Sequence, residues 1–156
     1  MKNLGFLKKL KKKEKLKLTE PSEEVKQAYL KKSSSYLESA KLLLKNKKFE
    51  EAISLAYYSM YYSLLALLFK VGIKSENHTA SILLLKELFG LDNSKILNAK
   101  KERIDKQYYI DFKIVESNVM TLIKVAEEFN AEIFDFSEKL SFTELEKIRN
   151  KFKKMI

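Results

Sequence analysis

The most apolar stretch of the chain covers residues 52–69 and contains no charged side chain, although one third of the protein is charged. A helix that is apolar on almost every side must be surrounded by other helices or by lipid. Two tyrosine pairs and three serines lie within the stretch, and buried hydroxyl groups find partners in a bundle more readily than in hydrocarbon. The pattern predicts the central helix of a helical bundle.

The neighbouring segments show the spacing of apolar residues that is typical of helices packed on one side. The longest such series steps by three or four residues and consists of Val119, Ile123, Ala126, Phe129, Ile133, Phe136 and Leu140. Pro21, Gly72 and Gly90 mark helix starts and ends. Helices are predicted over residues 23–45, 49–71 and 78–89. A further helix is capped by Asp92 or Ser94 and reaches Tyr108, another starts near 116, and a last one follows the capping-box residues Ser141 and Glu144. Residues 73–77 are predicted to be a loop.

This pattern predicts an all-α protein. With 3 glycines and 1 proline, the chain has few turn residues, which favours long helices and argues against a many-stranded sheet. We expect an antiparallel up-and-down bundle of four to five long helices with a short C-terminal helix. The expected division is a Lys-rich N-terminal tail at 1–20, the bundle at 21–140 and a C-terminal amphipathic helix at 141–156.

The net charge of +10 is distributed unevenly. Residues 1–20 contain eight lysines and two glutamates, a net charge of +6, so the rest of the chain carries the remaining +4. Such an excess attracts polyanions such as RNA, DNA or an anionic membrane. The lysines also interrupt the apolar region that a secretory signal needs. We interpret the segment either as a solvated, partly disordered tail or as a contact for nucleic acid or membrane.

Several classes of chemistry are excluded by composition. The chain has no cysteine and one histidine, His78, so neither a disulfide framework nor a usual zinc site is expected. Its three glycines are too scattered to form a phosphate loop or a dinucleotide fingerprint. We therefore expect no cofactor and no metal. The absence of cysteine favours a cytoplasmic location.

Only two of the 31 basic residues are arginines, Arg103 and Arg149. The planar guanidinium group offers several donors in a fixed geometry, which lysine does not. Arg103 is therefore a candidate for binding phosphate. The alternative is a salt bridge to Asp105, Asp111 or a glutamate elsewhere in the chain.

Four motifs in order carry a resemblance to a known family. They are Ala-Tyr-Tyr-Ser-Met-Tyr-Tyr at 56–62, Gly72 followed by His78 and Phe89, Arg-Ile-Asp-Lys-Gln-Tyr-Tyr at 103–109, and Ala-Glu-Glu-Phe at 126–129. Together they resemble the HEPN (higher eukaryotes and prokaryotes nucleotide-binding) domain, in its small prokaryotic or archaeal single-domain branch. The resemblance covers approximately residues 25–133.

The resemblance implies a protein that binds RNA or a nucleotide within a toxin–antitoxin, defence or RNA-processing system. It also implies a homodimer and, in some members, a nucleotidyltransferase-type antitoxin as partner. Catalytic members are metal-independent endoribonucleases with an R-x4-H motif. Here Tyr108 stands at the histidine position after Arg103, and Tyr109 follows. Since tyrosine, with a pKa of about 10, is a poor proton acceptor at neutral pH, we expect weak or no ribonuclease activity.

The binding candidates are Arg103, Tyr108, Tyr109, His78 and Asp105. His78 either assists Arg103 or is merely a first-turn residue of its helix. We interpret the tyrosines of the central helix mainly as core or dimer contacts.

Two other functions stay open. One is a tetratricopeptide-like protein-interaction module, because the helices before and after residues 45–50 form a hairpin, although a single copy argues against a solenoid. The other, weaker one is membrane association through the N-terminal segment or the uncharged helix.

Overall fold

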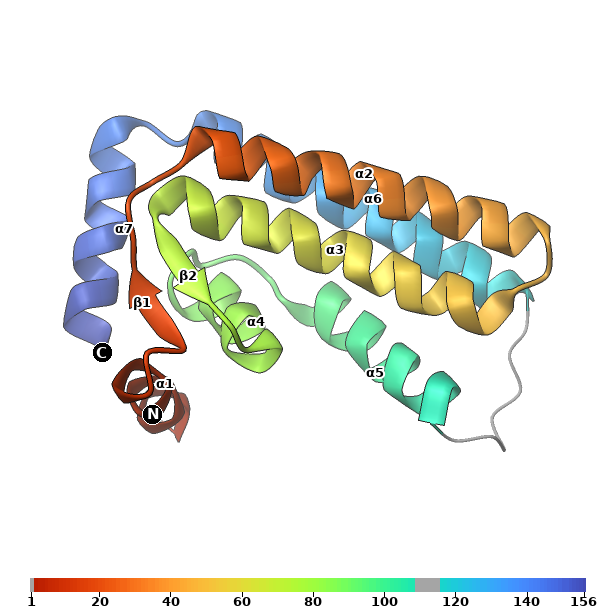
Figure 1. The fold of residues 1–156 in the computed structure, drawn as a ribbon, viewed down its shortest axis with the longest axis horizontal. Helices are drawn as coiled ribbons and strands as arrows, with labels where there is room; N and C mark the ends of the chain where they lie inside the picture. The colour runs from red at the N-terminus through yellow and green to blue at the C-terminus, as the bar shows by residue number, and fades with distance from the viewer. Residues whose placement is uncertain (1, 109–115) are drawn as a thin grey trace.

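The computed structural model describes residues 2–108 and 116–156 of the chain. Its elements in chain order are α1 (Lys2–Lys12), β1 (Leu16–Leu18), α2 (Glu23–Lys45), α3 (Phe49–Val71), β2 (Ile73–Ser75), α4 (His78–Glu87), α5 (Ser94–Tyr108), α6 (Glu116–Lys139) and α7 (Phe142–Met155). The long helices α2, α3 and α6 run side by side along the molecule, with α5 against α3 and α6 (Figure 1). The predicted all-α bundle is confirmed.

Helix α3, which contains the uncharged stretch 52–69, lies at the centre of this bundle, in contact with α2, α4, α5 and α6. It is long and apolar enough to cross a membrane, but 72% of its most apolar stretch is buried inside the protein. Tyr57, Leu64, Leu67 and Leu68 are fully buried. Its apolar surface is therefore covered by helices, which is the first of the two environments that the sequence allowed.

Local signals set most helix ends where the sequence predicted them, although α4 ends at Glu87 and not at Phe89. The Ser22 hydroxyl accepts a hydrogen bond from the Val25 amide at the start of α2, and Asn77 Oδ1 accepts from the Ala80 amide at the start of α4. Gly72 adopts a left-handed φ of 78° after α3, and Ser141 forms the predicted capping box with Glu144 before α7.

The N-terminal segment differs from the expected solvated tail. Residues 2–12 form α1, which buries Leu7 and Leu10, and β1 pairs antiparallel with β2 so that Leu16 faces Ser75 and Leu18 faces Ile73. The prediction of a partly disordered tail is therefore wrong for residues 2–18, and the predicted loop at 73–77 contains β2. The physical reason is that Leu7, Leu10 and Leu16, which stand among the lysines, are buried in the hydrophobic core at the end of the bundle.

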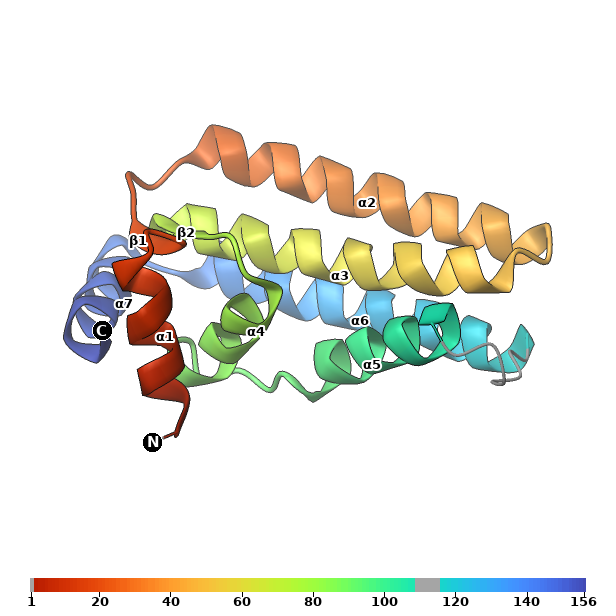
Figure 2. The same ribbon diagram turned by 60° about the horizontal axis from the view of Figure 1, so that its bottom comes forward.

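Helix α7 lies across the same end of the bundle as α1 (Figures 1 and 2). Nη1 of Arg149 donates hydrogen bonds to the carbonyl oxygens of Thr19 (2.9 Å), Val71 (2.8 Å) and Gly72 (3.2 Å). A side chain at Gly72 would collide with this guanidinium group and with the Thr19 carbonyl. Arg149 thus joins α7 to the end of α3 and to the segment that precedes α2.

Candidate functional site

The single histidine contacts the central helix at the start of α4. His78 Nδ1 lies 2.8 Å from the Tyr57 hydroxyl oxygen, within hydrogen-bond distance. The imidazole ring also stacks on Tyr61, with ring centroids 3.7 Å apart and an angle of 11° between the planes. Two buried tyrosines of α3 therefore position His78, although 21 residues separate it from Tyr57 in the chain.

Arg103 reaches the same tyrosines from α5. Its guanidinium carbon lies 4.9 Å from the centre of the Tyr58 ring and 5.8 Å from that of Tyr57, which is cation–π distance. His78 and Arg103 thus contact one common side chain, Tyr57. The bundle brings together the two candidates that the sequence could not place relative to each other.

A third basic group, Lys100, completes the cluster. It precedes Arg103 by three residues, so both lie on one face of α5. Its Nζ donates a hydrogen bond to Thr79 Oγ1 at 2.8 Å, next to His78. We call His78, Lys100 and Arg103 the cationic cluster. The sequence reasoning did not select Lys100, although its helical spacing from Arg103 was visible.

The electrostatics show that Lys100 and Arg103 disfavour a positive charge on His78 and that Arg103 disfavours one on Lys100. Burial lowers the pKa of His78, and the nearby charges of Lys100 and Arg103 lower it further. Burial and Arg103 likewise lower the pKa of Lys100. A site whose own basic groups resist protonation is one where a bound anion would relieve the repulsion.

Within the described residues, no carboxylate neutralises the cluster. None of the ion pairs there includes His78, Lys100 or Arg103, and Asp105 forms none with the arginine. Nε of Arg103 is buried and has no hydrogen-bond partner among them either. The salt bridge considered as the alternative role of Arg103 is thus absent in this part of the protein, while Asp111 lies outside it.

The hydrogen bond between Tyr57 and His78 decides which imidazole nitrogen carries the proton. Burial raises the pKa of Tyr57, so its hydroxyl group is protonated at neutral pH. His78 Nδ1 is the only hydrogen-bond acceptor found for this buried hydroxyl in the described residues. Since a buried O–H without an acceptor is costly, the hydroxyl donates to Nδ1. Neutral His78 therefore carries its proton on Nε2 and acts there as a donor.

Tyr108 and Tyr109 are the two remaining binding candidates. Tyr108 ends α5, but its side chain and all of Tyr109 lie outside the described residues. The tyrosines of α3 combine both interpretations: Tyr57 and Tyr61 belong to the core, and Tyr57 also contacts His78 and Arg103. Sequence reasoning favoured the structural role over contact with a ligand.

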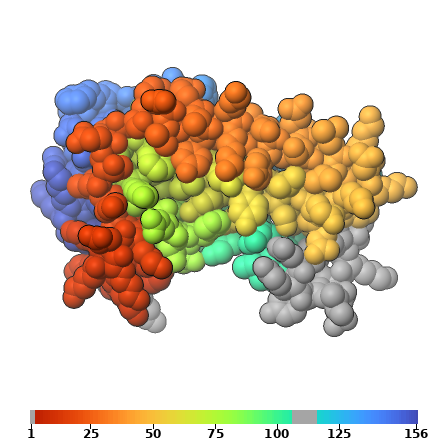
Figure 3. Space-filling model, in the orientation of Figure 1, coloured from red at the N-terminus to blue at the C-terminus, as the bar shows by residue number. Residues whose placement is uncertain are grey.

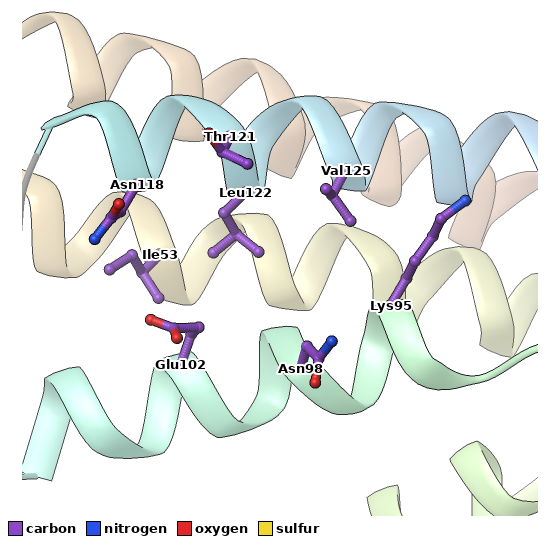
Figure 4. A pocket seen from close by; sticks show the side chains of 8 residues that line it. All are labelled: Ile53, Lys95, Asn98, Glu102, Asn118, Thr121, Leu122 and Val125. Carbon is purple, nitrogen blue, oxygen red and sulfur yellow. The ribbon is translucent and has the colours of Figure 1, made fainter.

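A separate groove of about 420 Å³ lies between α3, α5 and α6 (Figure 4). It is lined by Ile53, Lys95, Asn98, Glu102, Asn118, Thr121, Leu122 and Val125. Its lysine pairs with Glu132, and Glu102 adds a negative charge. The groove therefore lacks the excess positive charge of the cationic cluster.

In the described ranges, 2–108 and 116–156, no three acidic or histidine side chains lie close enough together to hold a metal ion.

The fold and this cluster define an all-α bundle with a cationic, aromatic site beside its central helix. The model of the HEPN domain family matches residues 26–139, so the chain belongs to this family. No curated protein matches the chain. Family membership supports a role connected with RNA or nucleotides. The match begins in α2 and ends with α6, so it leaves α1, β1 and α7 outside.

Proposed function

We propose that the protein binds the phosphate of RNA or of a nucleotide at the cationic cluster and has weak or no ribonuclease activity. The observation that carries this proposal is the convergence of His78, Lys100 and Arg103 without a neutralising carboxylate among the described residues. An RNA phosphate supplies the missing negative charge.

Each group of the cluster has a distinct part in binding. The Arg103 guanidinium donates two parallel hydrogen bonds to phosphate oxygens, and Lys100 contributes a point charge. His78 donates from Nε2. The rings of Tyr108 and Tyr109 follow Arg103 in the chain, and we propose that they stack on a base or ribose. Asp105 is proposed to contact a sugar hydroxyl.

Cleavage of RNA next to a 2′-hydroxyl needs a group that accepts its proton. The Nδ1 lone pair of His78 already accepts the Tyr57 hydroxyl, and the raised pKa of Tyr57 makes that residue a poor acceptor itself. Tyr108 replaces the motif histidine. Because a missing general base lowers rates by about 10²- to 10⁴-fold, we propose binding as the main activity.

The biological setting is proposed from the family. We propose a homodimer in the cytoplasm that acts in a toxin–antitoxin, defence or RNA-processing system, with a nucleotidyltransferase-type antitoxin as a candidate partner. The tetratricopeptide-like alternative has lost its support, because α2 and α3 pack with α6 in one bundle that the HEPN model matches.

The test measures binding and cleavage of labelled RNA without divalent metal, for the wild type, Arg103→Ala and Lys101→Ala. Lys101 is the matched control, since it is exposed and lies on the same helix. We expect Arg103→Ala to bind at least about tenfold more weakly, as the loss of a charged hydrogen bond predicts, while Lys101→Ala stays near wild type and the RNA stays intact.

Two outcomes would contradict the proposal. Equal RNA binding by Arg103→Ala and the wild type would show that the cationic cluster is not the RNA-binding site. Cleavage by the wild type that is lost in Arg103→Ala would instead show a ribonuclease, and the proton acceptor would then be sought among His78, Tyr108 and Tyr109.

A further inference from the structure

Nearly all of the protein's net charge lies at one end of the bundle. Residues 1–20 carry +6 and residues 141–156 carry +3, so residues 21–140 retain only +1 of the total of +10. Both terminal segments lie at the same end of the molecule (Figures 1 and 2). Lys11 Nζ donates a hydrogen bond of 2.8 Å to the Ile156 carbonyl oxygen, which links α1 to the C-terminus. Two segments that are distant in sequence thus form one basic surface.

The lysines of α1 are directed away from the protein by the burial of its leucines. Leu7 and Leu10 face the bundle, and helical geometry places Lys8, Lys9 and Lys12 on the opposite side. All three lysines are exposed. In the part of the chain that the structure describes, none of them forms an ion pair. Their charges are therefore available to a partner.

The same arrangement continues on the β-ribbon and on α7. On the β-ribbon, Lys17 is exposed and lies opposite Lys74, whose ammonium group pairs with Glu76 at 3.6 Å. None of the ion pairs within the described residues includes Lys17. On α7, Lys147, Lys151 and Lys154 are exposed and follow helical spacing along one side, while Phe152 is buried. We call the exposed lysines of α1, β1 and α7 the basic end.

We propose that the basic end binds the phosphate backbone of single-stranded RNA, as a second contact beside the cationic cluster. This inference rests on the proposed function in that the ligand is RNA. Lysines act as point charges on phosphates, so the contact is independent of base sequence. The two surfaces are neighbours in the chain and in space: β2 ends three residues before His78, and α1 contacts α4. Figure 3 shows α1 projecting beside α4.

The distribution of apolar side chains favours RNA over an anionic membrane. A helix that lies on a membrane inserts an exposed apolar face between the lipids. Here Leu7, Leu10 and Phe152 are buried in the protein. The strongly exposed Phe142 stands at the far end of α7 beside Glu144 and Glu146, whose charges oppose an anionic surface.

The test compares two triple variants of the full chain. One changes Lys8, Lys9 and Lys12 to Gln. The control changes Lys45, Lys47 and Lys48 to Gln, which removes the same charge at the α2–α3 turn, at the opposite end of the bundle (Figure 1). Binding of labelled polyuridylate is measured between about 50 and 200 mM salt. AMP and vesicles of phosphatidylserine and phosphatidylcholine are the second and third probes, and thermal melting confirms that both variants fold.

We expect the α1 variant to bind polyuridylate roughly tenfold more weakly. The slope of log affinity against log salt should become shallower by about 2, because single strands release about 0.7 counterions per phosphate contact and three lysines are removed. AMP binding and the control variant stay near wild type. Equal weakening in both triple variants would overturn the proposal, because net charge alone would then explain it. Unchanged polyuridylate binding by the α1 variant would also overturn it, and loss of vesicle binding in that case would assign the surface to a membrane.

The result also separates this inference from the proposed function. Suppose that the α1 variant binds polyuridylate more weakly, while Arg103→Ala binds both polyuridylate and AMP like the wild type. The basic end is then an RNA-binding surface and the cationic cluster is not. If Arg103→Ala instead binds both ligands more weakly and the α1 variant binds both like the wild type, the cationic cluster is the site and the proposal for the basic end is wrong.

Discussion

The two arginines of the chain are used in opposite ways. Arg149 donates to three backbone carbonyls of α3 and the N-terminal segment, whereas Arg103 lies over two tyrosine rings with a buried Nε that has no partner among the described residues. Both are set in a chain whose other basic residues are lysines. Arg149, whose Nη1 is occupied by backbone carbonyls, maintains the fold. Arg103, whose buried Nε has no partner in the described part of the chain and which lies near Lys100, is suited to a ligand.

The largest expected effect comes from removing the occupied arginine. Arg149→Ala leaves the Thr19, Val71 and Gly72 carbonyls without their common donor, and we expect a loss of about 3 kcal/mol in the free energy of unfolding. The melting temperature should then fall by roughly 6–12 °C. Arg149→Lys is the control and should recover part of the loss. An unchanged melting temperature for Arg149→Ala would end the structural assignment.

A substitution at Gly72 tests the same contact from the other side. Gly72→Ala places a methyl group against the Arg149 guanidinium and the Thr19 carbonyl, at a φ of 78° that costs a non-glycine residue about 1–2 kcal/mol by itself. We expect a loss of about 2 kcal/mol or more in urea denaturation. Gly90→Ala is a matched control, because its φ is also positive but open space surrounds it. Equal losses in the two variants would show that the close contact adds nothing.

The unoccupied arginine should affect binding and leave stability almost unchanged. Arg103→Ala removes a cation–π contact but also relieves repulsion from Lys100, so we expect a change of less than about 1 kcal/mol in unfolding free energy. RNA binding, in contrast, should fall at least about tenfold. A loss of stability comparable to that of Arg149→Ala would contradict the distinction between the two arginines.

The smallest expected effect is the dependence of stability on pH through His78. Its pKa is lowered in the folded protein, so the unfolded chain binds the proton more tightly. The contribution of His78 to the free energy of unfolding is therefore fully present above the unfolded pKa of about 6.5, and it is lost as the pH falls through the lowered folded pKa. His78 is the only histidine, so one NMR titration curve reports it. Tyr57→Phe should raise this pKa by freeing Nδ1, and RNA should raise it by adding negative charge. A pKa that neither change moves would contradict the assigned hydrogen bond and site.

The helical part of the fold was predictable because its signals are local. Ser22, Gly72 and the Ser141–Glu144 capping box act within a few residues of the helix ends that they set. The uncharged stretch 52–69 likewise indicated the central position of α3. Apolar spacing predicted the core face of α6, where Val119, Ile123, Ala126, Phe129 and Ile133 are all buried. Each of these features depends on a short stretch of chain and on the general cost of exposing apolar surface.

The N-terminal segment was mispredicted because its structure depends on distant partners. Leu7 and Leu10 form a helical pattern that is too short to be stable alone, and the pairing of β1 with β2 joins residues 16–18 to 73–75. Composition pointed to Arg103, and the HEPN motifs pointed to His78, but neither gave the distance between them. Lys100 was missed since nothing in the sequence shows which face of α5 meets α4.

The sequence by itself determined which segments between residues 23 and 155 are helical, that the helix with the uncharged stretch 52–69 is central, that the charge is concentrated near the N-terminus, and to which family the chain belongs. Only the tertiary structure decided that His78 and Arg103 meet at Tyr57 and that Lys100 lies next to them, bonded to Thr79. It also decided that Arg149 joins α7 to the end of α3 and to the segment before α2, and that both termini form one basic end. The reason is physical. Helix formation depends on interactions within a few residues, whereas a site is assembled by contacts between side chains that packing alone brings together.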